Sequence, residues 1–295
     1  MNILVIRFSS LGDVILAAPV FSFLRDRYPD ANITLLTRSR YCNLFIDDPR
    51  VNKVLCMDRG ELPRQFLDGE WDSIIDLQAN SCSRKAVRRV GGEATVGRFQ
   101  KNYFKRFMLL VFRINLYNPA EHVICRYARA AGYSEKTCGP LPSPVIERRN
   151  DSFERDQRLN SIRRSGKPVL ALMPFGAWKN KEWPVASYEQ VGAQFISSGW
   201  QVVIMGGPGE KEKAAKLKSR LGPMSISFAG ELPVESNIPV FKLCRLSLGN
   251  DSGLSHLARA SGVKTGIIYG ATSWHFGFSP CGEPAFRIFQ KPLCC

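Results

Sequence analysis

Short apolar runs alternate with amphipathic segments along the whole chain, a pattern typical of buried strands and covering helices in a parallel α/β sheet. The runs predicted as strands are Asn2–Phe8, Ile33–Leu36, Val54–Met57, Ser73–Leu77, Pro168–Met173, Gln201–Met205, Leu246–Leu248 and Thr265–Tyr269. The segments predicted as helices are Asp13–Tyr28, His122–Ala131, Val185–Ser198 and Ser252–Ser261. We therefore predict an α/β protein with parallel sheets.

The strand–helix rhythm is interrupted once, near the middle of the chain. The stretch GPLPSPVIERRN from Gly139 to Asn150 carries three prolines and no sustained period, as a linker would. The same alternation resumes after it. We therefore expect two α/β domains, residues 1–150 and 151–295, each long enough to bury its own core.

The chain is strongly basic, with 41 Lys and Arg against 26 Asp and Glu, a net charge of +15. Part of the excess lies between Arg84 and Arg113, where nine basic residues accompany one acid and many apolar side chains. This stretch is either a docking surface for an anionic partner or a core helix with a solvated basic face. Charge alone does not separate lipid, nucleotide and nucleic-acid partners, although no recognised nucleic-acid-binding motif accompanies it.

Cysteine content and hydropathy indicate the cellular compartment of the chain. Nine cysteines are too few for a disulfide scaffold and show no spacing typical of structural zinc, so we expect a reduced, cytoplasmic chain. The apolar start resembles a signal peptide, but Arg7 and Asp13 interrupt it, and no run of 18 apolar residues occurs. We expect neither secretion by that route nor a membrane span.

One candidate for chemistry joins the first predicted strand to the first helix. In an open parallel sheet, a loop such as Ser9–Asp13 (SSLGD) faces the ligand crevice. Gly12 permits close backbone approach. Asp13 is then either a catalytic carboxylate or a helix cap.

Three further candidates follow strands of the second half. The segment Asn250–Leu257 (NDSGLSHL) opens a helix whose amides suit a diphosphate, or it is a well-capped helix with one histidine. In Pro174–Pro184 (PFGAWKNKEWP), Lys179 and Lys181 offer charges for phosphate or are simply solvated. The turn Gly206–Glu210 (GGPGE) offers a carboxylate to ribose hydroxyls but lacks the GxGxxG spacing.

The order of SSLGDVILAAP, KEWP, NDSGLSHLA and IIYGAT along the chain resembles glycosyltransferase family 9, the bacterial lipopolysaccharide heptosyltransferases. The resemblance implies a GT-B fold of two Rossmann-like domains whose parallel sheets face each other across a cleft. It implies that residues 1–150 bind the acceptor and residues 151–295 bind the nucleotide-sugar donor. The family usually continues for several more helices, so a donor domain without them is expected.

The resemblance also implies roles for individual residues. Asp13 would be the general base that removes a proton from the acceptor hydroxyl as it attacks ADP-heptose with inversion. The donor-binding residues would be Gly176, Ala177, Lys181, Glu210, Asp251, Ser252, Gly253 and His256. The acceptor-binding residues would be Ser10, Gly12, Lys101, Lys105 and Arg106.

The implied reaction needs no cofactor and no metal. Lys181 and the helix start at Ser252 would stabilise the charge that grows on the leaving ADP, and no Asp-x-Asp pair is present to hold a metal. The expected partners are ADP-heptose or a similar nucleotide sugar, a phosphorylated lipopolysaccharide core acceptor (Kdo-lipid A or heptosyl-Kdo-lipid A) and the anionic inner membrane, without nucleic acid. Three alternatives stay open: another nucleotide-sugar donor, a nucleotide-sugar epimerase of the same architecture, or a non-catalytic nucleotide-sugar-binding protein.

Overall fold

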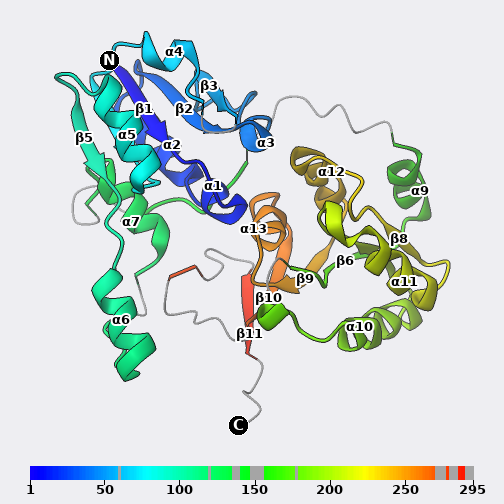
Figure 1. Cartoon of the computed structure of the whole chain (residues 1–295). Helices are drawn as coiled ribbons and strands as arrows, with labels where there is room; N and C mark the ends of the chain where they lie inside the picture. Colours follow the sequence, from blue (N-terminus) through cyan, green and yellow to red (C-terminus); the bar gives the residue numbers. More distant parts are fainter. Residues whose placement is uncertain are drawn as a thin grey trace. The chain divides into compact units, whose positions relative to one another are not determined.

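A computed structural model describes residues 1–58, 61–118, 121–134, 140–146, 156–176, 179–269, 277–278 and 285–289. The chain forms two compact units (Figure 1). Unit 1 comprises Met1–Arg149 with Trp274–Phe278, and unit 2 comprises Asn150–Ser273 with Ser279–Cys295. Each unit is built on one parallel sheet, so the predicted α/β fold class is confirmed.

The sheet of unit 1 has the strand order β3-β2-β1-β4-β5. Its strands are β1 (Asn2–Ile6), β2 (Asn32–Arg38), β3 (Lys53–Met57), β4 (Ser73–Asp76) and β5 (Thr95–Arg98). The chain winds outward from β1 to one edge and then returns to add β4 and β5 on the other side. Loops that follow β1 and β4 therefore diverge, which makes the ends of these two strands the natural ligand position.

The helices of unit 1 connect these strands. They are α1 (Leu11–Ile15), α2 (Ala18–Arg27), α3 (Ser39–Cys42), α4 (Arg64–Leu67), α5 (Ser81–Val90), α6 (Tyr103–Phe112) and α7 (Val123–Ala130). The prediction of one continuous helix over Asp13–Tyr28 is wrong, because the helix breaks between α1 and α2. Pro19 has no N–H to donate to the carbonyl of Ile15, and it lies instead in the first turn of α2, where that N–H is not needed.

The sheet of unit 2 repeats the same winding with one more strand, in the order β11-β10-β9-β6-β7-β8. Its strands are β6 (Val169–Met173), β7 (Gln201–Ile204), β8 (Ser225–Ser227), β9 (Leu246–Asn250), β10 (Lys264–Tyr269) and β11 (Ala285–Phe289). Its helices are α9 (Gln157–Ser165), α10 (Val185–Ser197), α11 (Lys211–Leu221), α12 (Asn237–Lys242) and α13 (Gly253–Ala260). Here the winding reverses between β6 and β9.

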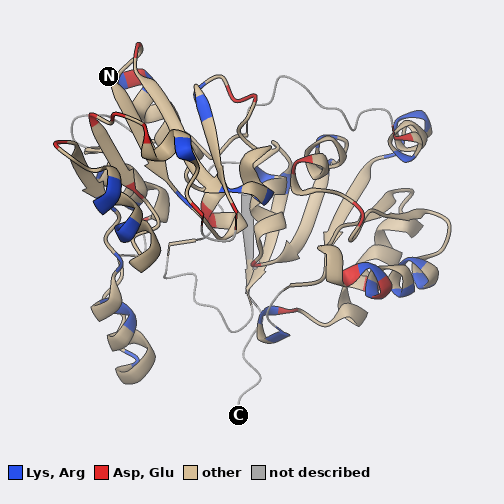
Figure 2. Ribbon diagram, turned by 45° about the horizontal axis from the view of Figure 1, so that its top comes forward, with Lys and Arg blue, Asp and Glu red and all other residues tan. Residues whose placement is uncertain are grey.

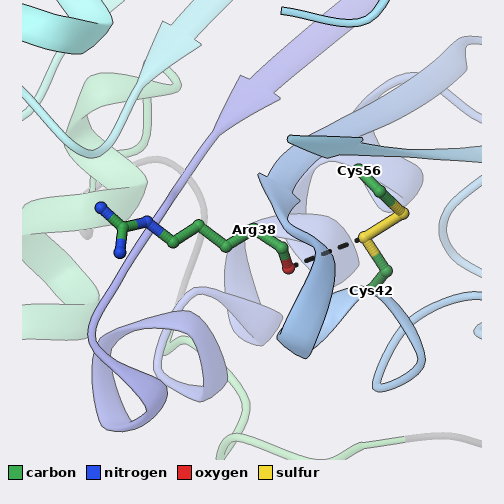
Figure 3. The surroundings of a disulfide bond; sticks show 3 residues. All are labelled: Arg38, Cys42 and Cys56. Carbon is green, nitrogen blue, oxygen red and sulfur yellow. Dashed lines mark hydrogen bonds between the residues drawn. A yellow bond between two sulfur atoms is a disulfide. The ribbon is translucent and has the colours of Figure 1, made fainter. Parts of the chain in front are cut away.

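A disulfide joins Cys42, at the end of α3, to Cys56 in β3 (Figure 3). The expectation that the cysteines are all reduced is therefore wrong for this pair. β2 and β3 are neighbours in which Thr37 lies opposite Cys56, and Cys42 Sγ lies 3.7 Å from the carbonyl oxygen of Arg38. The tertiary structure brings the two cysteines together, so their spacing in the sequence does not predict the disulfide.

Helix α7 packs closely on the edge strand β5 (Figure 1). A Cβ at Gly97 would lie 1.8 Å from the carbonyl oxygen of Ala130, so only glycine allows this approach. Next to it, the rings of Phe99 and Tyr127 meet edge to face with centroids 4.8 Å apart. Gly97 thus sets how near Tyr127 comes to the central strands.

We predict that Gly97→Ala lowers the free energy of unfolding by about 3 kcal/mol, since the added methyl group meets backbone that cannot rotate away. Urea unfolding followed by circular dichroism measures this. Gly209→Ala is the matched control, because a Cβ there meets no atom within 4 Å. Equal midpoints for the two variants would show that α7 shifts freely.

Candidate functional site

In unit 1, the carboxylate of Asp13 is held from three directions. Its Oδ1 lies 2.8 Å from Nη2 of Arg7 and accepts a hydrogen bond of 2.7 Å from the hydroxyl of Tyr127. Its Oδ2 accepts from the backbone N–H (3.0 Å) and the hydroxyl (2.7 Å) of Ser10. The Asp13 side chain is 18% exposed and that of Arg7 only 7%. A nearly buried ion pair therefore occupies the end of β1.

The surroundings keep this carboxylate ionised. Burial by itself raises the pKa of Asp13, but the Arg7 charge and the hydrogen bonds from Ser10 and Tyr127 outweigh it and hold the pKa below its usual range. Burial also raises the pKa of Tyr127 well above its ordinary value, so its hydroxyl stays protonated and remains a donor. At neutral pH, Asp13 is thus a charged proton acceptor.

The helix-cap interpretation of Asp13 agrees with the structure, and the catalytic interpretation stays a prediction. Ser10 is the residue that precedes α1, and Asp13 is its third residue. Because the Asp13 carboxylate accepts the N–H of Ser10, it closes the helix start as in half of a capping box. Gly12 is buried within this turn, whereas Ser10 is exposed. The carboxylate therefore caps the start of α1, and its lowered pKa keeps it charged.

Two polar side chains, the half-buried Gln78 and the buried Asp76, fix the loops where the winding reverses in unit 1. Oε1 of Gln78, just after β4, accepts the N–H groups of Phe8 and Ser9 at 3.0 and 3.2 Å. Asp76, fully buried at the end of β4, accepts from the N–H of Ala79 at 2.7 Å. The loop that carries Ser10 and Asp13 is therefore tied to β4.

In unit 2, Asn250 at the end of β9 plays the corresponding role. Its Nδ2 donates to the carbonyl oxygen of Pro174 at 2.9 Å. Its Oδ1 accepts from the N–H of Trp183 at 2.8 Å and the hydroxyl of Tyr188 at 2.9 Å. One almost fully buried amide thus holds the loop after β6 beside the start of α13.

That loop brings a lysine to the start of α13. Nζ of Lys181 lies 3.0 Å from Oδ2 of Asp251, with the two side chains 29% and 13% exposed. Ser252 precedes α13, and Gly253 is its first residue. His256 follows one turn later and is buried. A cation and helical N–H groups gathered at one helix start make this a suitable place for a phosphate.

The remaining predicted donor residues have contacts within their own loops. Glu210 Oε2 accepts the N–H of Gly207 at 2.6 Å, so the carboxylate closes the GGPGE turn. The N–H of Gly176 donates to Oε1 of Glu182 at 3.0 Å. A ligand phosphate would have to replace Glu182 to reach the Gly176 amide. Ala177 lies outside the described residues.

The basic stretch of unit 1 forms α5, β5 and α6 rather than one helix. Helix α6 has no buried residue and extends away from the sheet (Figure 1). Its exposed large apolar side chains are Tyr103, Phe104, Phe107, Leu110, Val111 and Phe112. The core-helix interpretation is therefore wrong for α6. Arg106 is exposed while Lys101 and Lys105 are half-buried, and the basic residues of α5 and α6 are blue in Figure 2.

None of the described helices is long and apolar enough to cross a membrane. Within the same part of the chain, no group of three or more His, Cys, Asp or Glu residues is placed to hold a metal ion.

Four residues that shape these sites have no role assigned from the sequence. Arg7 was visible as a lone charge at the end of an apolar strand, and Asn250 as a polar residue at the end of another. Gln78 follows a predicted strand in the same way. Tyr127 had no local signal, because it lies 114 positions from the carboxylate that it contacts.

Comparison with known proteins gives a consistent result. A family profile described as glycosyltransferase family 9 (heptosyltransferase) matches residues 59–285. The chain is 25% identical to lipopolysaccharide heptosyltransferase 1 of Pseudomonas aeruginosa over 92% of this chain and 79% of the relative. It is 26% identical to lipopolysaccharide heptosyltransferase 2 of Salmonella typhimurium, over 94% of this chain and 84% of the relative. The solved structure of E. coli ADP-heptose lipopolysaccharide heptosyltransferase II superposes with a TM-score of 0.78 at 24% identity, covering 98% of this chain and 90% of that one.

Proposed function

Since the chain belongs to glycosyltransferase family 9, the heptosyltransferases, we propose that it transfers heptose from ADP-heptose to the inner core of lipopolysaccharide with inversion. The observation that carries the proposal is the Asp13 carboxylate, which is kept ionised by its pair with Arg7 and lies where the strand order of unit 1 reverses. Unit 1 then binds the acceptor and unit 2 the donor. The relatives named for this activity support the choice of sugar and acceptor.

On the donor side, Lys181 and the start of α13 bind the diphosphate. The Lys181 side chain is 29% exposed in its pair with Asp251, so phosphate can reach the lysine and take the place of that carboxylate. Asp251 is then available to accept from heptose hydroxyls, as Glu210 is from the ribose. Charge grows on ADP as its bond to heptose breaks, so the lysine and the Ser252–Gly253 amides bind the transition state more tightly than the ground state.

On the acceptor side, Asp13 takes the proton of the attacking hydroxyl. The acceptor oxygen forms its bond to the anomeric carbon as the bond to ADP breaks, and the electron pair leaves with ADP. The proton ends on the Asp13 carboxylate. Ser10 and Gly12 line the approach, and the negative charge needed for proton transfer is maintained by Arg7.

Helix α6 gives the enzyme a way to reach a lipid-linked acceptor. Its exposed aromatic and aliphatic side chains suit the boundary between headgroups and acyl chains. Lys101, Lys105 and Arg106 lie in or beside it and suit anionic headgroups and phosphorylated acceptors. We place the protein peripherally, at the cytoplasmic face of the inner membrane.

We predict that Lys181→Ala weakens ADP binding by about 1.5–3 kcal/mol, the worth of a charged hydrogen bond. Isothermal titration calorimetry with ADP measures this. Lys179→Ala removes an exposed lysine from the same loop and should leave the affinity unchanged. If the two variants bound ADP equally well, Lys181 would not be a phosphate ligand.

We predict that Asp13→Asn lowers heptose transfer from ADP-heptose to a Kdo-lipid acceptor by about 10²–10⁴-fold, because the proton acceptor is lost. ADP affinity should stay at the parental value, since the phosphate contacts lie in unit 2. Measuring both in one preparation separates lost chemistry from lost binding.

The Asn variant also leaves the buried Arg7 without a counter-charge, which costs about 3–5 kcal/mol. The double variant Arg7→Met with Asp13→Asn removes both charges and covers the case in which the single variant unfolds. Transfer at the parental rate in either folded variant would exclude Asp13 as the base.

We predict that changing Lys101, Lys105 and Arg106 together to Gln lowers affinity for vesicles containing anionic phospholipid by roughly 100-fold at low salt, at about 1 kcal/mol per charge. The deficit should vanish near 1 M salt, where the Debye length is about 3 Å. Changing Lys213, Lys216 and Lys218 on α11 to Gln removes equal charge from another exposed surface and should have little effect. An equal loss in both variants would indicate unspecific attraction.

A further inference from the structure

We infer that Arg7 and Tyr127 are positioning residues for Asp13, which fix its Oδ1 and leave Oδ2 as the oxygen that receives the acceptor's proton. This inference rests on the proposed function, because it assigns a division of labour within the proposed base. It names two residues that the family motifs in the sequence do not contain.

The guanidinium of Arg7 is fixed on several sides. It follows β1, and its Nη1 donates to the carbonyl oxygen of Leu77 after β4. Its Nη2 lies 2.8 Å from Oδ1 of Asp13. Its Cζ lies 5.1 Å from the centroid of the Tyr127 ring. The charge is thus held between the two strands where the winding reverses.

Tyr127 reaches the same oxygen from another element. It is fully buried on α7, and its ring is held by Phe99. Its hydroxyl donates to Oδ1 of Asp13 at 2.7 Å. Because α7 is seated against β5 at Gly97, the position of this hydroxyl is set by the packing of the whole unit.

The two carboxylate oxygens therefore differ in what surrounds them. Oδ1 has two partners whose side chains are fixed in place, since both Arg7 and Tyr127 are buried. Oδ2 has only Ser10 partners in the described contacts, and Ser10 is exposed. A serine hydroxyl rotates readily, so an acceptor hydroxyl can take its place at Oδ2 while the Ser10 N–H still orients the oxygen.

A purely structural role explains Arg7 less well. Its Nε is buried and has no hydrogen-bond partner among the described residues. Desolvation of a buried ion pair commonly offsets its attraction, so such a pair contributes little net stability. The charged or titratable groups that face the site are Arg7 directly after β1, Tyr127 from α7 and, behind Tyr127, Arg126. Arg7 is the only one of these charges in direct contact with the Asp13 carboxylate in the described structure.

The test measures the ionisation of Asp13 directly. Protein labelled with ¹³C at aspartate carboxyl groups is titrated by NMR, and the Asp13 signal is assigned by its loss in Asp13→Asn. Arg7→Met should raise the pKa of Asp13 by about 1–3 pH units, because an adjacent opposite charge lowers a carboxyl pKa by that amount. Tyr127→Phe should raise it less, and Arg7→Lys should return it toward the parental value.

The pH dependence of heptose transfer is the second readout. A raised pKa keeps Asp13 protonated to higher pH, so the acid limb of kcat/KM should move upward in Arg7→Met and Tyr127→Phe by the NMR shift. Tyr41→Phe changes a buried tyrosine of the same unit that stacks on Arg40, and it should move neither readout.

An unchanged Asp13 pKa in folded Arg7→Met and Tyr127→Phe would overturn the inference, whatever their rates. If Arg7→Met does not fold, Tyr127→Phe decides alone, because it removes only a hydroxyl. Undiminished transfer by Asp13→Asn is a different result, which rejects the proposed base itself. The failure of this inference and the failure of the proposed function are therefore distinguishable.

Discussion

Both units depend on one topological constraint, the reversal of strand order beside their first strand. In a parallel sheet each strand must be followed by a crossover, and two crossovers that leave neighbouring strands in opposite directions cannot cover the strand ends between them. The reversal lies between β1 and β4 in unit 1 and between β6 and β9 in unit 2. Asp13 follows β1, Lys181 follows β6 and Asp251 follows β9.

Open strand ends expose backbone groups, and side-chain amides satisfy them. Gln78 accepts two N–H groups from the loop after β1, and Asn250 binds a carbonyl, an N–H and a tyrosine hydroxyl around the loop after β6. An amide suits this position because it both donates and accepts without carrying charge. Loops so held can present Asp13 and Lys181 at defined positions, which binding and catalysis both require.

The sequence predicts strands most clearly where every residue of the strand is buried. The central strands were predicted because Ile3–Ile6 and Val169–Met173 are unbroken apolar runs, and such runs are buried on both faces. Strand β5 was not predicted, since Thr95–Arg98 is an edge with little burial and a glycine. The Asp13 motif was visible locally, but the contact with Tyr127 and the Cys42–Cys56 bond arise from tertiary packing and leave no short-range pattern.

The two reversal points carry ion pairs of similar length but different character, and burial explains the difference. The pair of Arg7 with Asp13 is screened from water on the arginine side, so removing either charge is costly and the pair stays intact. The side chain of Lys181 is 29% exposed, so water reaches the lysine side of its pair with Asp251. The same fold position thus gives a buried-arginine pair that keeps the Asp13 carboxylate charged in unit 1 and a pair with a solvent-accessible lysine in unit 2.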